Sequence, residues 1–208
     1  MDRQEEKTQI ITNPSGRELK EHGSYRFPFL VSRERLSRYE TGSFLWHWHT
    51  EIEFTLVTDG CMIYQINDSS ISLNEGDALF GNSGTLHSAH RADEGDCRYI
   101  SITFSWSRLL YGYEGSLLQE KYVEPLIHNS GLTFLHFHRK EFFHGKENYY
   151  GKESFNSEES WHGEVIEGLR HITAVYEEKK PLYELQLQEE LLHIWRLMLE
   201  HCCLDKAC

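Results

Sequence analysis

Three histidines and one glutamate, grouped in two short stretches, are the residues of this chain best suited to chemistry. The first stretch holds His47, His49 and Glu53, and the second ends at His87. Imidazole nitrogens and carboxylate oxygens are ligands that divalent Zn, Fe, Mn and Ni accept. The same groups can instead hydrogen-bond a small organic molecule in a pocket that holds no metal. The residue types alone leave both uses open.

The spacing of these residues suits a small β-barrel. Residues two apart on a strand share a face, so His47 and His49 point the same way. A turn after Thr50 can bring Glu53 to that face, and His87 arrives from a separate strand. We therefore expect the four side chains to meet near the mouth of a barrel. The alternatives are coincidence in a chain with 13 histidines, or a simple ion pair of Glu53 with one histidine.

Short segments rich in Val, Ile, Phe, Tyr and Thr, broken by Gly, Asn, Asp and Ser, fill the chain from Tyr25 to Trp106. This pattern predicts many short antiparallel strands in a sandwich or barrel, with a hairpin at Asp59-Gly60. A short helix is predicted around Ser116–Ile127, interrupted at Pro125. The predicted strands are Tyr25–Ser32, Ser43–His49, Ile52–Thr58, Cys61–Asn67, Ser70–Leu73, Ala78–Gly81, Thr85–Arg91, Arg98–Trp106 and Leu132–Phe137.

The hydrophobic period becomes helical near the C-terminus. Residues 138–157 are polar and predict an exposed loop, and residues 158–178 and 182–201 predict two helices. The second helix carries an apolar stripe too wide for a solvated helix, so it must pack on something. The barrel, the sister helix and a second subunit are all candidates.

Composition and charge exclude several classes of protein. The 208 residues have a mean hydropathy of −0.58 and contain no apolar run of about 18 residues, the length needed to cross a bilayer. The charged N-terminus lacks a signal peptide, which predicts a cytoplasmic protein, and the five cysteines are expected to be reduced. A net charge of −12 has the wrong sign for a DNA-binding surface, so any DNA contact belongs to a part outside this chain.

Two motifs in the chain resemble those of the cupin family. Gly42-x4-His47-x-His49-x3-Glu53-x6-Gly60 is close to the first cupin motif, with one residue fewer after the leading glycine. Gly76-x5-Asn82-x-Gly84-x2-His87 is close to the second. Asn82 stands where cupins usually carry proline, and Arg91 where many carry asparagine. The resemblance implies that His47, His49, Glu53 and His87 fill the four metal-ligand positions of the family.

A narrower resemblance links the chain to the N-terminal sensor domain of AraC-type transcription regulators. It rests on the stretches His47 to Glu53, Glu75 to Phe80 and Thr85 to Ser88, and it covers about residues 25–201. In that family a pair of helices after the barrel makes the dimer contact. The resemblance implies a mainly β fold with C-terminal helices, in this order: a flexible arm (1–23), a cupin-type antiparallel β-barrel (24–137), the polar loop (138–157), a two-helix hairpin for dimerisation (158–201) and a tail (202–208). The family's DNA-binding domain is expected to lie outside this chain.

Three functions are compatible with these features. The favoured one is an effector-sensing and dimerisation domain of an AraC-type regulator, which binds a small metabolite such as a sugar through His47, His49, Glu53 and His87. The alternative is a metal-dependent cupin enzyme, such as a dioxygenase, isomerase or epimerase, which uses the same residues as metal ligands. The third is an interaction module with an inert barrel. The sequence shows no second acid–base constellation, which argues against the enzyme.

Overall fold

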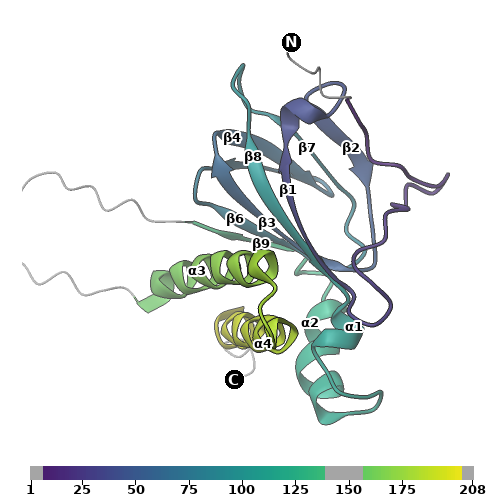
Figure 1. Cartoon of the computed structure of the whole chain (residues 1–208), viewed down its shortest axis with the longest axis vertical. Helices are drawn as coiled ribbons and strands as arrows, with labels where there is room; N and C mark the ends of the chain where they lie inside the picture. The colour runs from purple at the N-terminus through teal and green to yellow at the C-terminus, as the bar shows by residue number, and fades with distance from the viewer. Residues whose placement is uncertain (1–6, 139–156, 203–208) are drawn as a thin grey trace, which may run out of the picture.

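Two antiparallel sheets face each other in the computed structural model, which describes residues 7–138 and 157–202 (Figure 1). The first sheet has the strand order β1-β8-β3-β6-β9, and the second has the order β2-β7-β4-β5. The strands are β1 (Phe29–Arg35), β2 (Ser43–His47), β3 (Ile52–Asp59), β4 (Cys61–Ile66), β5 (Ser69–Asn74), β6 (Ala78–Gly81), β7 (His87–Arg91), β8 (Arg98–Phe104) and β9 (Phe134–Phe137). A 3₁₀ turn, η1 (Leu36–Arg38), follows β1.

Alternation along β3 separates two environments. Phe54 and Leu56 belong to a hydrophobic cluster that includes the C-terminal helices. Val57 packs instead with residues of the second sheet. Glu53 and Thr55 share the parity of Val57, so they face the space between the sheets. The first sheet therefore has one mainly apolar face and one face that can carry polar groups.

Two long helices cover the apolar face of the first sheet (Figure 1). They are α3 (Ser157–Glu178) and α4 (Tyr183–Cys202), which pack against each other. Phe80 of β6 contacts Trp195 of α4 at a ring-centroid distance of 6.4 Å, and Phe137 of β9 meets Trp161 of α3 edge-on at 5.4 Å. The predicted mainly β fold with a packed C-terminal helix pair is confirmed. No described helix is long and apolar enough to span a bilayer.

The boundaries of some helices and strands differ from the predicted ones. The predicted strand Arg98–Trp106 ends at Phe104, and a short helix, α1 (Trp106–Leu109), follows it. The predicted helix at 116–127 is a π-helical turn, η2 (Gln119–Val123), followed by α2 (Glu124–Ile127). Pro125 has no N–H for the helical ladder, which explains an interruption at this point. The predicted loop at 138–157 and the tail at 202–208 lie almost entirely outside the described residues.

Gly60 and Gly115 provide a matched test of the β3–β4 hairpin. Both have a left-handed backbone, with φ of +75° and +79°. A Cβ on Gly60 would lie 2.3 Å from the Asp96 carbonyl oxygen, whereas a Cβ on Gly115 meets nothing within 4 Å. Gly115→Ala should cost about 1–2 kcal/mol of unfolding free energy from backbone strain alone. Gly60→Ala should cost about 1–3 kcal/mol more because of the clash. Urea denaturation measures both, and equal losses would contradict the tight hairpin.

Candidate functional site

The four residues singled out by the sequence lie together between the two sheets. His47 ends β2 and pairs with His87 at the start of β7, with their ring centroids 4.1 Å apart. The ring of His49 is 5.1 Å from that of His87. Glu53 reaches the cluster from β3 of the other sheet, and its Oε2 lies 3.5 Å from His49 Nε2. We call His47, His49, Glu53 and His87 the barrel cluster.

Backbone carbonyls hold all three imidazoles in the same protonation pattern. The Nδ1 atom of His47 lies 2.8 Å from the carbonyl oxygen two residues before it, and that of His87 lies 3.0 Å from the equivalent oxygen. His49 Nδ1 lies 3.2 Å from the carbonyl oxygen two residues after it. A carbonyl can only accept, so each neutral imidazole carries its proton on Nδ1 and leaves Nε2 as an acceptor. The Nε2 atoms of His49 and His87 are buried and have no hydrogen-bond partner among the described residues.

The electrostatics favour neutral imidazoles at His47 and His87 beside an ionised Glu53 carboxylate. Burial, followed by the nearby charge of His47, lowers the pKa of His87 to about 3. Burial also lowers the pKa of His47. Burial alone would raise the pKa of Glu53, but the contact with His49 and the electrostatic influence of the other two imidazoles outweigh it and hold this pKa below its usual range. Neutral imidazoles and a carboxylate are the forms that bind a metal ion.

Hydroxyl groups and aromatic rings complete the surroundings of the barrel cluster. Glu53 accepts hydrogen bonds from the hydroxyls of Thr55 and Thr103, at 3.0 and 3.4 Å. Tyr64 stacks on His87, with ring centroids 5.9 Å apart and planes 10° from parallel. Phe44 meets His87 edge-on at 6.4 Å. We did not predict these neighbours, although the alternation of strand residues that gave His47 and His49 could have placed Thr55 beside Glu53.

The segment predicted as a flexible arm contributes an ion-pair cluster at the cavity between the sheets. Within residues 7–23, Glu18 N–H donates to the carbonyl of Trp48 at 2.9 Å. His22 lies 3.0 Å from Glu18 and 3.6 Å from Glu51, and its ring is 5.0 Å from that of His49. Burial would lower the pKa of His22, but its hydrogen bonds to Glu18 and Glu51 raise it to about 9. The His22 hydrogen bond likewise lowers the pKa of Glu51 to about 2. No periodic signal in the sequence points to this contact.

The cavity between the sheets is small. Its volume is about 30 Å³, and its lining includes His22, Phe44, His47, Glu53 and Thr103. This volume exceeds the roughly 10–15 Å³ that one water molecule needs, but it is far below the roughly 300 Å³ of the smallest small-molecule pockets. The cavity can therefore hold an ion or a water molecule, whereas a sugar-sized molecule requires the lining to move.

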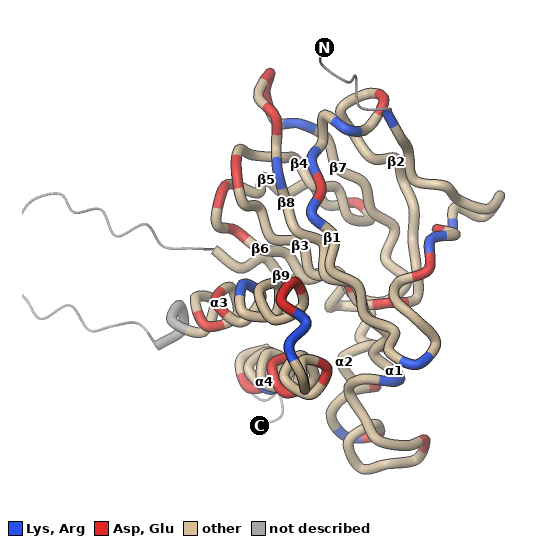
Figure 2. The backbone as a smooth tube through the Cα atoms, viewed as in Figure 1, with Lys and Arg blue, Asp and Glu red and all other residues tan. Residues whose placement is uncertain are grey.

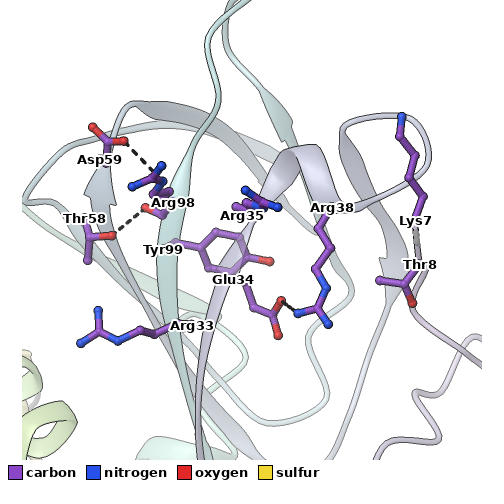
Figure 3. A pocket seen from close by; sticks show the side chains of 10 residues that line it. All are labelled: Lys7, Thr8, Arg33, Glu34, Arg35, Arg38, Thr58, Asp59, Arg98 and Tyr99. Atoms are coloured by element: carbon purple, nitrogen blue, oxygen red, sulfur yellow. Dashed lines mark hydrogen bonds and ion pairs between the residues drawn. The ribbon is translucent and has the colours of Figure 1, made fainter. Parts of the chain in front are cut away.

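A larger hollow lies elsewhere, on the surface formed by β1, β3 and β8 (Figure 3). It is open and measures about 1070 Å³, and Tyr99 and Glu34 border both this hollow and the inner cavity. Its lining is rich in lysine and arginine, shown in blue in Figure 2, although the chain as a whole has a net charge of −12. Three of its arginines are already paired with carboxylates: Arg38 with Glu34, Arg98 with Asp59, and Arg33 with Glu177. We therefore place the candidate site at the buried barrel cluster.

Asn82 explains one departure from the cupin motif. Its side-chain nitrogen lies 3.2, 3.1 and 2.8 Å from the carbonyl oxygens of Leu126, Ile127 and Leu132. Its backbone N–H donates to the Thr133 carbonyl at 2.9 Å. Proline could make none of these bonds. Asn82 thus ties the end of β6 to α2 and to the segment that leads into β9.

Comparison with known proteins supports the resemblance seen in the sequence. Residues 36–103, which include the whole barrel cluster, match the family model of the cupin domain. The chain is 28% identical over 187 residues to YdeC, an uncharacterised HTH-type transcriptional regulator of Bacillus subtilis (strain 168). The alignment covers 90% of this chain and 57% of the regulator, so the chain spans little more than half of that relative's length.

Similarity to solved structures is limited to part of the chain. A predicted oxalate decarboxylase from Thermotoga maritima is 24% identical, covers 36% of this chain and 64% of its own, and gives a TM-score of 0.33. A cupin 2 conserved barrel domain protein from Salinispora arenicola is 17% identical, covers 38% of this chain and 64% of its own, and gives a TM-score of 0.34. Nothing about activity follows from likenesses of this extent. From the match over residues 36–103 and the relationship to YdeC, this chain contains a cupin domain and is a homologue of an HTH-type transcriptional regulator.

Proposed function

We propose that this chain is the effector-sensing and dimerisation part of a cytoplasmic AraC-type transcription regulator. The observation that carries the proposal is the buried barrel cluster in a chain that aligns over 90% of its length with an HTH-type regulator. DNA binding would belong to a part of the protein outside this chain. The net charge of the chain, −12, agrees with this, because a DNA-binding surface is normally positively charged.

The chemistry of the barrel cluster selects the kind of effector. The partnerless Nε2 atoms of His49 and His87 are acceptors, and the Glu53 carboxylate is an acceptor as well. An effector that satisfies them must therefore bring several O–H or N–H donors. A sugar or another polyhydroxylated metabolite meets this need, and the rings of Phe44 and Tyr64 supply an apolar wall.

The size of the cavity couples binding to movement. A sugar-sized effector must displace part of the lining, and residues 7–23 are the part held mainly by polar contacts. Displacement of His22 would break its ion pairs with Glu18 and Glu51. Effector binding would then change the position of the arm and, through it, the geometry of attached domains.

A thermal-shift panel of sugars, polyols and aromatic acids tests this proposal. An effector at 100 times its dissociation constant should add about 2.7 kcal/mol to the unfolding free energy. For a chain of this length that is a rise in melting temperature of roughly 5–10 °C. His87→Gln should abolish the shift, whereas His90→Gln, an exposed position on the same strand, should keep it. The absence of any shift across the panel, or an unchanged response of His87→Gln, would count against the sensor.

A metal-dependent cupin enzyme is the second candidate, and one observation favours it. Ligand atoms of His47, His49 and His87 all lie within 4.8 Å of one another, with Glu53 beside them. The partnerless Nε2 atoms and the lowered imidazole pKa values fit a divalent Zn, Fe, Mn or Ni ion held by these four residues. When bound, such an ion would act as a Lewis acid with open positions for a substrate.

Metal analysis separates the two candidates. Protein without an affinity tag would be dialysed against each metal in turn and measured by mass spectrometry for metal per chain. The enzyme predicts one equivalent at the barrel cluster that Glu53→Ala and His87→Gln both lose and His90→Gln retains. It also predicts that loading this metal produces turnover of a cupin-type substrate. If both cluster variants retain every metal equivalent that the wild type binds, the barrel cluster holds no metal and this candidate is contradicted.

The helix pair is the proposed dimer contact, through residues 158–201. Leu182, just before α4, and Leu185 and Leu192 on α4 are exposed by 67%, 62% and 40%, whereas Leu187, Leu191, Ile194, Trp195, Leu197 and Met198 are buried. Leu185 and Leu192 are seven residues apart and so lie on the same side of the helix. Helix α4 also carries several acidic residues (Figure 2). A second copy of the hairpin would cover the exposed leucines.

Sedimentation velocity tests this contact. The wild-type chain should sediment as a dimer, and the double variant Leu185→Glu, Leu192→Glu should sediment as a monomer because it buries two charges in the interface. Leu117→Glu provides a control, since Leu117 is 67% exposed but lies outside the hairpin. A monomeric wild type, or a double variant that remains dimeric, would contradict the proposed contact.

A further inference from the structure

A second group of potential metal ligands lies at the opposite end of β6 from the barrel cluster. Asp77 immediately precedes β6, His136 belongs to β9, and His138 follows β9. His136 pairs with Leu79 across the two strands. Residues two apart share a face, so Asp77, His136 and His138 all project from the same side of this sheet edge. We call these three residues the edge cluster.

The ligand atoms of the edge cluster are close enough to share one ion. His136 Nε2 lies 3.5 Å from Asp77 Oδ2, and His138 Nδ1 lies 3.9 Å from Asp77 Oδ1. One ligand atom from each residue can be chosen so that all three lie within 4.8 Å of one another. Zn–N and Zn–O bonds of 2.0–2.2 Å in a tetrahedron separate neighbouring ligand atoms by roughly 3.4 Å. Small side-chain rotations would therefore close the site.

An unsatisfied buried atom marks this cluster as it marks the barrel cluster. Among the described residues, three buried side-chain N or O atoms have no hydrogen-bond partner, and all are imidazole Nε2 atoms. Two belong to His49 and His87, and the third belongs to His136. Buried polar atoms are nearly always satisfied, and an ion bound at the site is one of the few explanations for an exception.

Ion pairs between Asp77 and two protonated histidines do not explain the geometry of the edge cluster well. The ring centroids of His136 and His138 are only 3.7 Å apart, so two protonated imidazoles here would repel each other strongly. One carboxylate facing two neutral imidazoles is instead a donor set that zinc accepts in proteins. Asp77 is also held in place, because its Oδ2 accepts the Asn74 N–H at 3.0 Å.

The edge cluster is separate from the barrel cluster. Glu53 pairs with Gly81 at one end of β6, whereas Asp77 lies just before Ala78 at the other end. At about 3.3 Å per residue, the two groups are on the order of 13 Å apart along the strand. A single ion cannot serve both.

We propose that Asp77, His136 and His138 form a second divalent-metal site, with Zn²⁺ as its best occupant. Three protein ligands leave a fourth position for water or for a group from a ligand. The site would clamp the end of the edge strand β9 to β6. His138 N–H donates to His162 Nδ1 on α3 at 3.4 Å, so the ion would also steady the junction between the sheet and the helix pair.

Zn²⁺ titration of the chelator-stripped, untagged 208-residue chain tests this site, with Co²⁺ absorption in the visible range as a second readout. His138→Ala is the main variant, because this side chain is 60% exposed and its loss leaves the core intact. Asp77→Asn removes the charge but keeps an oxygen that can accept the Asn74 N–H. His90→Ala, an exposed histidine outside both clusters, is the control. His87→Gln disables the barrel cluster.

We expect His138→Ala and Asp77→Asn each to lose one equivalent of Zn²⁺, or to weaken it at least about 10-fold. His87→Gln should keep that equivalent, and His90→Ala should match the wild type. If the wild type binds only one equivalent, its loss in His138→Ala supports the edge cluster and leaves the barrel without metal. Retention of every equivalent in His138→Ala and Asp77→Asn, with affinity within twofold of wild type, would overturn the proposal.

Discussion

The burial of three imidazoles and one carboxylate between the sheets is the constraint on which this structure depends. Each such group costs free energy when it leaves water without a partner. The fold offsets this cost with backbone carbonyls at Nδ1 and threonine hydroxyls at Glu53. It leaves the Nε2 atoms of His49 and His87 without partners. The interior is therefore preorganised for something that donates hydrogen bonds or carries positive charge.

The two sheets and the helix pair make different contributions to this interior. The first sheet buries its apolar face under α3 and α4, which frees its other face to carry Glu53, Thr55 and Thr103. The second sheet supplies His47 and His87 as a directly paired couple on β2 and β7. The proposed sensor function needs such a polar interior inside a stable shell. The larger of the two apolar clusters lies on the other side of the first sheet, so a change at the polar groups of the interior leaves that cluster in place.

Much of the fold and the core of the site could be predicted from the sequence. Alternating apolar residues with Gly and Asn turns gave the strands, and a helical period gave α3 and α4, to within a few residues. His47, His49, Glu53 and His87 followed from strand periodicity and motif spacing. Residues 7–23 could not be placed in this way, because Glu18 and His22 are tied to the barrel by isolated contacts with Trp48 and Glu51 that leave no periodic pattern. The same holds for Asn82, whose three carbonyl partners lie about 45 residues or more along the chain.

The tautomer of each barrel histidine is set by main-chain oxygens at positions 45, 51 and 85. Every amino acid, proline included, supplies a carbonyl. Substitution of the side chain at Leu45, Glu51 or Thr85 therefore leaves in place the carbonyl oxygen that keeps the proton on Nδ1 and leaves Nε2 free to accept. Descendants of one ancestral barrel could acquire new specificities by altering the lining while inheriting the same inner chemistry unchanged.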